Sequence, residues 1–501
     1  MKNKILIPVL SILLLAGCTD FLDIRPEGTV PSSGMDYTKS ENIFKPVAAA
    51  YASLRDGNAH AFNYICTFEI TSDDADKGST PGDNPEAKQM DEFTYTPTHN
   101  LISGLWIGFY NIVSASNNAI GQMPLFEAAM QTATNKTYTR QCAAEVKVIR
   151  AYAYFNLTRA FGRVPIIDTI MTSEQLSSLT QSSKSQLYAF IEKDLQEAIP
   201  VLPTSYSKDY AGRITKFSAM AIKAKVHMYH ASVENSSANW DSVAVLTDKI
   251  IASGKFDLIP DFRAEFSMDY ENSKESLFEI QSSSLGASTG DNYPYVEYAY
   301  IQGPRGNSPS NMQGWGFCTP SDKLMNFYST RGETVRAAAT FLYRGTVTPE
   351  GDSIKKACTN PVYNGKVYSP SSYNKWNYNG YGFDHNLRII RYSDVLLMFA
   401  EAKVNGSAKG ITSGFDAISS INKVRVRAGL LTLGSVSLQN IWDERRAEFA
   451  LEEDRFFDLV RTGQAATVLG SKGFIAGKHE VFPIPDTQMQ LNTNLQQNPN
   501  Y

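Results

Sequence analysis

The sequence of 501 residues has little of what marks several common protein classes. It contains only five cysteines and six histidines, and 51 acidic residues nearly balance 47 basic ones. The formal net charge is therefore −4, which leaves no excess of basic residues for bulk attraction to nucleic acid. The sequence contains no H-E-x-x-H, P-loop or G-x-G-x-x-G motif. With 43% apolar and 20% charged residues, the composition is that of a folded chain and excludes a mostly disordered one.

Long hydrophobic runs are also scarce, and the longest is close to the N-terminus. Residues 5–16 are mostly apolar and follow Lys2 and Lys4. This run is too short to span a bilayer as a helix and is typical of a secretory signal peptide. It ends in Leu15-Ala16-Gly17-Cys18, which resembles the bacterial lipobox, in which the cysteine is lipidated. We expect residues 1–17 to be a lipoprotein signal peptide, Cys18 the lipid anchor and residues 18–34 a tether; a plain signal peptide with a chance cysteine is the alternative.

Four cysteines remain after Cys18, namely Cys66, Cys142, Cys318 and Cys358. A secreted protein is exposed to conditions that permit disulfides. However, the sequence has no C-x-x-C motif, and a chain of this length does not need disulfides to be stable. Buried free thiols are the favoured interpretation, with disulfide pairing left open.

Hydrophobic periodicity predicts a mainly α-helical protein with a tetratricopeptide-like scaffold of helix pairs. Helices are expected at 42–55, 102–123, 140–161, 185–199, 217–232 and 240–253, and again at 392–404, 414–428 and 438–463. The region between them is rich in Tyr, Gly, Ser, Asn and Pro, which indicates an irregular, loop-rich part with a few short strands. The expected organisation is a helical region at 35–254, a loop-rich ligand-binding region at 255–390, and helices and a tail at 391–501.

Several motifs, in order along nearly the whole chain, resemble the SusD/RagB family of outer-membrane nutrient-binding lipoproteins from the Bacteroidota. After the lipobox, the motifs that match the family are Asp20-Phe21-Leu22-Asp23; Glu69-Ile70-Thr71-Ser72-Asp73-Asp74; Trp106, Tyr110, Ile112 and Asn117; Arg150 to Pro165; Arg391-Tyr392-Ser393-Asp394-Val395-Leu396-Leu397-Met398-Phe399-Ala400-Glu401-Ala402; Glu444-Arg445-Arg446; and Pro483-Ile484-Pro485.

This resemblance implies a function in nutrient capture. Members of the family bind an oligosaccharide or other nutrient at the cell surface and work with a SusC-like TonB-dependent transporter. The resemblance implies no catalysis, no cofactor and no metal. It places the protein at the outer membrane, anchored by lipid and exposed at the surface.

The expected ligand contacts are Trp315, Tyr295, Tyr293, Asp73 and Asp74. Aromatic rings stack on the C–H face of a sugar, and carboxylates accept hydrogen bonds from its hydroxyls. Gly314 and Gly316 on either side of Trp315 leave the indole with little cover from neighbouring side chains. The tyrosines fit one face of a strand equally well, and the aspartates fit a solvated turn, a helix cap or a calcium loop. The segment from Asp73 to Asp83 has no aromatic residue, which weakens an assignment to helical α-glucan and leaves the ligand open.

Three further patterns resemble catalytic or metal-binding motifs. Glu444 and Glu448 are one helical turn apart, and a glycosidase pair is an alternative to an ion-pair network that fixes helix docking. Residues 286–290 match G-x-S-x-G, but the following residues do not begin a helix, as a nucleophile elbow requires. His227 and His230 share a helix face, but no third metal ligand is near them in sequence. A lipid-anchored hydrolase and a protein-binding adaptor are therefore the alternatives to a nutrient-binding lipoprotein.

Overall fold

A computed structural model of the chain describes residues 34–234, 236–282, 298–307, 314–372 and 385–501. The predicted signal peptide, Cys18 and the tether up to residue 33 lie outside these ranges, so their roles stay predictions. Within the described ranges, no helix combines the length and the apolar character needed to cross a membrane.

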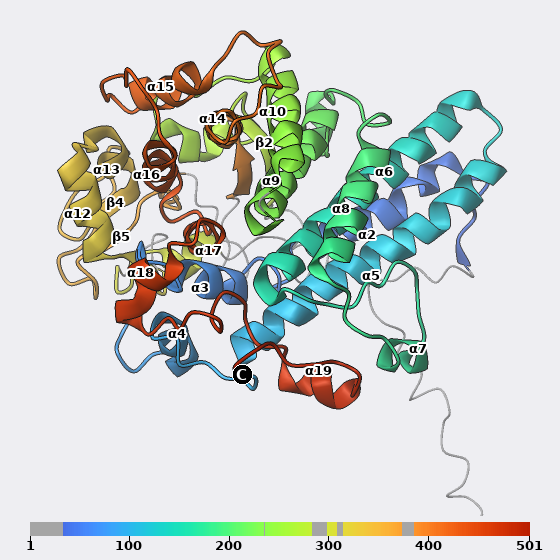
Figure 1. Cartoon of the computed structure of the whole chain (residues 1–501), viewed down its shortest axis with the longest axis horizontal. Coiled ribbons are helices and arrows are strands. Elements are labelled where there is room, and N and C mark those ends of the chain that lie inside the picture. The colour runs from blue at the N-terminus through green and yellow to red at the C-terminus, as the bar shows by residue number, and fades with distance from the viewer. Residues whose placement is uncertain (1–33, 235, 283–297, 308–313, 373–384) are drawn as a thin grey trace, which may run out of the picture.

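The N-terminal half is a stack of helices, as the periodicity predicted (Figure 1). The two longest, α5 and α6, pack against each other; α8 packs on α6, and α9 packs on α10. The elements of this half are α2 (Phe44–Ser53), α3 (Phe62–Ile70), β1 (Ala75–Gly78), α4 (Pro85–Asp91), α5 (Asn100–Ala129), α6 (Ala133–Phe161), α7 (Ser173–Ser177), α8 (Lys184–Ala198), α9 (Lys216–Glu234) and α10 (Ser237–Ala252).

Local sequence signals set where these helices begin and end. The Thr132 hydroxyl accepts the Asn135 amide at 3.1 Å and caps α6, which ends at Gly162 in a conformation with φ of 75°. Ser183 and Gln186 form a reciprocal capping box at the start of α8. On α9, the small side chains Ala221 and Ala224 are fully buried, which allows neighbouring helices to approach closely.

The middle and C-terminal parts are more irregular, and their described residues form short helices and three two-stranded antiparallel sheets: β1–β3, β2–β6 and β4–β5. Their elements are β2 (Ser276–Ile280), α11 (Tyr298–Gln302), β3 (Phe317–Pro320), α12 (Asp322–Arg331), α13 (Thr334–Thr340), β4 (Phe341–Tyr343), β5 (Val362–Asn364), β6 (Leu387–Arg391), α14 (Tyr392–Val404), α15 (Ala417–Arg427), α16 (Leu438–Phe449), α17 (Arg455–Arg461), α18 (Ala465–Leu469) and α19 (Asp486–Leu491). The predicted fold class, mainly α with a loop-rich part and few short strands, is confirmed.

The two helical blocks pack together although the loop-rich region separates them in sequence. Helix α14 packs against α9 and α10, and α17 contacts α3 and α9. Figure 1 shows α14 and α17 beside the green helices of the N-terminal half. The domain boundaries expected from composition stay a prediction.

The prediction of a single helix at 438–463 is wrong. The chain forms α16 and α17 with a break between them, where Leu451 and Glu453 take left-handed conformations with φ of 64° and 61°. A left-handed backbone conformation costs free energy in any residue other than glycine, and it persists where surrounding contacts hold it in place. Here the Glu453 amide donates to the buried carboxylate of Glu69 at 2.8 Å.

The motif residues Asn117 on α5 and Arg150 on α6 form a buried polar clamp with Asp194 on α8. Arg150 makes two hydrogen bonds of 2.8 Å to the carboxylate of Asp194, and a third of 2.8 Å to the side-chain oxygen of Asn117. Bidentate arginine–carboxylate pairs fix orientation as well as distance. The resemblance motifs on these helices therefore act in helix docking.

The cysteines after Cys18 are free thiols. Cys66, Cys142, Cys318 and Cys358 are all buried. Burial raises the pKa of the Cys142 thiol to about 12, so it stays protonated at neutral pH.

Candidate functional site

The C-terminal motifs build a buried core of arginines and carboxylates. Glu444 and Glu448 are fully buried rather than solvated. Glu448 accepts hydrogen bonds from Arg336 at 3.0 Å, from Arg391 at 2.9 Å and from Arg427. Although burial alone raises the pKa of Glu448, the three guanidinium charges outweigh it and hold that pKa well below its ordinary range. The expected ion-pair network that fixes helix docking is confirmed. The glycosidase pair does not fit these residues, because neither carboxylate reaches solvent.

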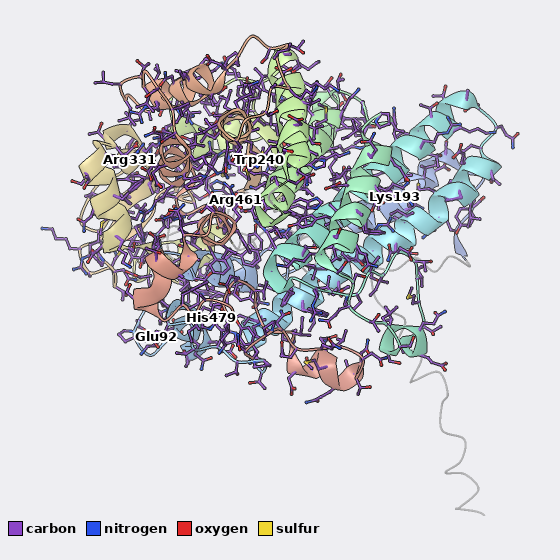
Figure 2. The ribbon with its side chains drawn as sticks, viewed as in Figure 1. Glu92, Lys193, Trp240, Arg331, Arg461 and His479 are labelled. Carbon is purple, nitrogen blue, oxygen red and sulfur yellow. The ribbon has the colours of Figure 1, made fainter. Side chains whose placement is uncertain are left out.

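The network continues toward α14 and α17. Arg445 donates to Asp394 at 2.5 Å and to Asp458 at 3.0 Å. Arg461 donates to Glu401 at 2.6 Å and to Asp458 at 2.6 Å, and Figure 2 labels it on α17 near the centre of the view. Because these pairs join α14, α16 and α17, they lock the C-terminal helices into one unit.

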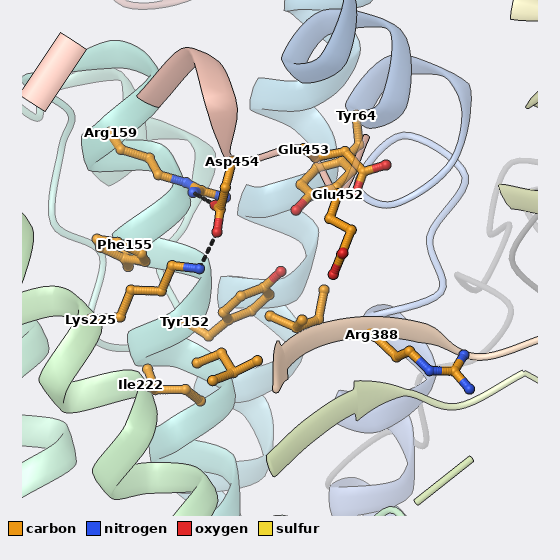
Figure 3. A pocket seen from close by; sticks show the side chains of 12 residues that line it. Tyr64, Tyr152, Phe155, Arg159, Ile222, Lys225, Arg388, Glu452, Glu453 and Asp454 are labelled. Carbon is orange, nitrogen blue, oxygen red and sulfur yellow. Dashed lines mark hydrogen bonds and ion pairs between the residues drawn. The ribbon is translucent and has the colours of Figure 1, made fainter. Parts of the chain in front are cut away.

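A small cavity of about 20 Å³ lies beside this core, between α6, α9, β6 and the break after α16 (Figure 3). Asp454 is held there by Arg159 at 2.9 Å and by Lys225. This volume is room for about one water molecule and none for a sugar. The cavity is therefore part of the folded core and not a ligand site.

Next to this cavity, Glu69 makes the stability of the protein depend on pH. Burial raises its pKa to about 8, whereas an unfolded glutamate titrates near 4.5. The folded state therefore binds more protons than the unfolded state between these values, and the free energy of unfolding falls as pH rises through this window. We expect Glu69→Gln to gain stability over the unchanged protein from pH 5 to pH 8, by up to about 1.4 kcal/mol per pH unit. Urea unfolding at three pH values measures this.

Glu127→Gln is the matched control for that change, because Glu127 pairs with Arg140 on the surface. Its stability relative to the unchanged protein is expected to stay constant across the same window. If the free energy of unfolding depended on pH in the same way for Glu69→Gln and the unchanged protein, Glu69 would not carry a proton in the folded state.

Two sequence-distant segments of the predicted site meet in the β1–β3 sheet. Ala75 pairs with Pro320 at one end, and Gly78 pairs with Phe317 at the other. Asp73 and Asp74 precede β1, and Trp315 precedes β3. Because the strands are antiparallel, the aspartates lie at one end of the ladder and Trp315 at the other, separated by about five residues of extended chain or roughly 16 Å.

Asp73 and Asp74 are buried and paired with arginines from the C-terminal helices. Asp73 accepts from Arg455 at 2.8 Å, and Asp74 accepts from Arg446 at 2.7 Å. Burial raises the pKa of Asp74, while for Asp73 the charges of Arg455 and Arg446 outweigh burial and lower the pKa. Their carboxylates thus join the segment after α3 to α16 and α17, and their role as ligand contacts stays a prediction.

Trp315 is half-buried and packs against two other aromatic rings. Its ring centroid lies 5.4 Å from that of Tyr300 and 5.9 Å from that of Phe62, both edge-to-face. The flanking glycines have a different role from the one expected: a Cβ on Gly314 would lie 2.5 Å from the Cα of Gly303, and Gly316 has φ of +73°. They let two backbone segments touch, and the indole is supported by aromatic neighbours rather than left bare.

A partly exposed polar group lies beside this aromatic cluster. Arg305 donates to Asp83 at 2.5 Å and to the Ser79 hydroxyl at 2.8 Å, and its guanidinium lies 3.4 Å from the backbone oxygen of Trp315. The Arg305 and Asp83 side chains are 34% and 33% exposed. Burial alone raises the pKa of Asp83, but its hydrogen bond from Ser79 and the charge of Arg305 lower it, so it is ionised at neutral pH.

The candidate site is therefore Trp315 with Phe62, Tyr300, Asp83 and Arg305. The sequence pointed to Trp315 but not to the other four. Asp83 is the last residue of the acidic segment from Asp73 to Asp83, and this position was the one sequence signal that pointed to it. Phe62, Tyr300 and Arg305 belong to no local motif. Tyr293, Tyr295 and the G-x-S-x-G segment lie outside the described residues, so their roles stay predictions.

Two larger recesses lie elsewhere on the molecule. One, of about 620 Å³, is apolar and lies between α5, α7 and α19, with Ile107, Ile170 and Leu491 exposed in it. The other, of about 600 Å³, lies between residues 204–218 and 255–279 and contains the exposed ring of Tyr210. The second combines an aromatic ring with polar groups, so it is a rival location for a sugar.

Comparison with known proteins gives two family matches in separate parts of the chain. The model described as "SusD family" matches residues 343–501, and the model described as "Starch-binding associating with outer membrane" matches residues 20–228. A SusD-like protein of Bacteroides ovatus is 27% identical over 92% of this chain and 82% of its own length. SusD-like protein P2 of Formosa agariphila is 27% identical over the full length of both chains.

Solved structures agree with these matches. Surface glycan-binding protein A from Bacteroides thetaiotaomicron, in complex with laminarihexaose, has a TM-score of 0.77 and is 27% identical, covering 92% of this chain and 99% of its own. A structure titled laminarin binding SusD-like protein has a TM-score of 0.76 and 26% identity, with the same coverage. Both are similar to this chain over nearly its whole length.

Proposed function

The chain belongs to the SusD family, and from this premise we propose that it is a cell-surface lipoprotein that binds an oligosaccharide and delivers it to a SusC-like TonB-dependent transporter in the outer membrane. The lipid on Cys18 holds it to the membrane. The protein makes or breaks no covalent bond in its cargo.

The observation that carries this proposal is a half-buried Trp315 whose backbone oxygen lies 3.4 Å from the guanidinium of the partly exposed Arg305–Asp83 pair. An indole supported edge-on by Phe62 and Tyr300 is fixed in place before a ligand arrives. Fixing the ring beforehand reduces the entropy lost on binding. Beside it, the partly exposed guanidinium and carboxylate supply donors and acceptors for sugar hydroxyls.

The ligand we propose is a glucan of the laminarin type. This rests on the two similar structures, one titled as laminarin-binding and one solved with laminarihexaose. A site with one stacking ring and a few hydrogen bonds supports modest affinity, with Kd on the order of micromolar to millimolar. That range suits a protein that must release its cargo to a transporter.

Titration of the purified protein with laminarihexaose by calorimetry tests the function. We expect saturable binding in that range, weaker binding of maltohexaose, and no release of reducing ends on prolonged incubation. Release of reducing ends would favour a hydrolase, and failure to bind any glycan in a broad array would favour a protein-binding adaptor. Co-purification from outer membranes is expected to recover a TonB-dependent barrel, and its consistent absence would contradict the transporter partnership.

A further inference from the structure

His227 and His230 on α9 meet a third ligand that the sequence did not reveal. Glu192 on α8 places its Oε1 atom 2.8 Å from Nδ1 of His230 and 3.3 Å from Nδ1 of His227. One donor atom from each of the three residues lies within 4.8 Å of the other two. The cluster is far along the sequence from the candidate glycan site.

A fourth oxygen approaches from the next helix. The side-chain oxygen of Asn239, on α10, lies 2.9 Å from Nδ1 of His227. Three consecutive helices, α8, α9 and α10, therefore direct polar atoms to one point. The side chains of His227, His230 and Glu192 are 8%, 12% and 23% exposed, so the point is sheltered but open to a solvated ion.

The separations fit a tetrahedral metal centre after small side-chain movements. Zinc binds histidine nitrogen at about 2.0–2.1 Å and carboxylate oxygen at about 2.0–2.2 Å, which places two ligand atoms roughly 3.4 Å apart. The two histidine–carboxylate separations, 2.8 Å and 3.3 Å, are shorter than this by about 0.6 Å and about 0.1 Å. Without a metal, imidazole N–H groups donate to the carboxylate; with one, each proton moves to the other ring nitrogen and the Nδ1 lone pair faces the metal.

The surroundings orient the cluster. Tyr188 stacks on the ring of His230, with centroids 4.3 Å apart and an interplanar angle of 8°. Lys223, one turn before His227, directs its ammonium to Gln196 at 2.5 Å, so this neighbouring cation is already bound elsewhere. A stacked ring and a carboxylate shared by two imidazoles hold the ligand atoms near their positions for coordination.

We propose that Glu192, His227 and His230 form a binding site for one divalent transition-metal ion of the zinc type, with Asn239 or a water completing the coordination. Nitrogen ligands together with one carboxylate favour zinc, cobalt, nickel or copper over calcium or magnesium. The bound ion would join α8 to α9 and stabilise this part of the helical scaffold.

Titration of the full chain in detergent, without a polyhistidine tag and after chelation, tests the site with Co²⁺ and then Zn²⁺. We expect one Co²⁺ per chain with the visible absorption of a tetrahedral site, displacement of that signal by Zn²⁺, and a higher melting temperature with Zn²⁺. Glu192→Gln and His230→Gln should weaken Co²⁺ binding at least about tenfold.

Glu197→Gln is the matched control, because Glu197 is on the same helix but pairs with Lys147 on the surface. It should bind Co²⁺ as the unchanged protein does. Equal binding by Glu192→Gln, or no stoichiometric Co²⁺ binding by the unchanged protein, would overturn the proposal. Should a variant fail to fold, metal-induced shifts of the His227 and His230 ring protons in the unchanged protein decide the question alone.

Discussion

Replacing Glu448 with alanine is expected to lower the free energy of unfolding by about 3–5 kcal/mol, because the change leaves buried guanidinium groups without a shared partner. Glu448 is fully buried and binds Arg336, Arg391 and Arg427. Each arginine keeps another carboxylate, but the core then holds one more positive charge than before. Urea unfolding, followed by circular dichroism, measures the loss.

Glu127→Ala provides the control for Glu448→Ala. It removes a carboxylate from a surface pair with Arg140, whose side chains are 39% and 54% exposed, and should cost about 0–1 kcal/mol. If both variants lost a similar free energy of unfolding, the buried network would contribute no more to stability than a surface ion pair does. A loss confined to Glu448→Ala supports the role of the motif helices as one docked unit.

Much of the helical scaffold could be predicted from the sequence because its signals are local. Apolar spacing and terminal residues define α14, whose bounds are those expected, and place α8 and α10 within a few residues. The break between α16 and α17 could not be predicted. It depends on Glu453 donating its amide to Glu69, which is 384 residues earlier in the chain, and no local pattern signals such a contact.

The candidate site was harder to predict, because its members come from distant parts of the chain. Trp315 stands out in the sequence, whereas its partners Phe62 and Arg305 are ordinary residues until the β1–β3 sheet brings their segments together. The acidic pair Asp73–Asp74 resembled a ligand-binding loop, and its arginine partners are on helices roughly 370 residues later. Charge alone does not tell a buried ion pair from a ligand contact.

The metal-ligating cluster illustrates the same limit. His227 and His230 are visible as a pair at helical spacing, but Glu192 belongs to the preceding helix of the scaffold. Only the packing of α8 on α9 brings the carboxylate to the imidazoles. A pair of histidines on one helix therefore does not by itself show a metal site, because the third ligand is contributed by a neighbouring helix.

Trp315→Ala is expected to weaken binding of laminarihexaose by about 30-fold or more. A well-supported aromatic anchor at the centre of a site commonly contributes 2 kcal/mol or more, which corresponds to about this change in Kd. Because Trp315 is half-buried against Phe62 and Tyr300, the alanine variant also loses some packing, so its helical content and melting temperature are measured alongside. Trp315→Phe keeps an aromatic face and should recover part of the affinity.

Tyr210→Ala separates this site from the rival recess, because Tyr210 is an exposed ring with polar neighbours between residues 204–218 and 255–279. If the ligand binds at Trp315, Tyr210→Ala binds laminarihexaose as tightly as the unchanged protein. The reverse pattern, a loss with Tyr210→Ala and none with Trp315→Ala, would move the glycan site to that recess while leaving the family and the fold intact. Where both variants keep the helical content and melting temperature of the unchanged protein, a difference in their affinities reports where the sugar lies and not how well the protein folds.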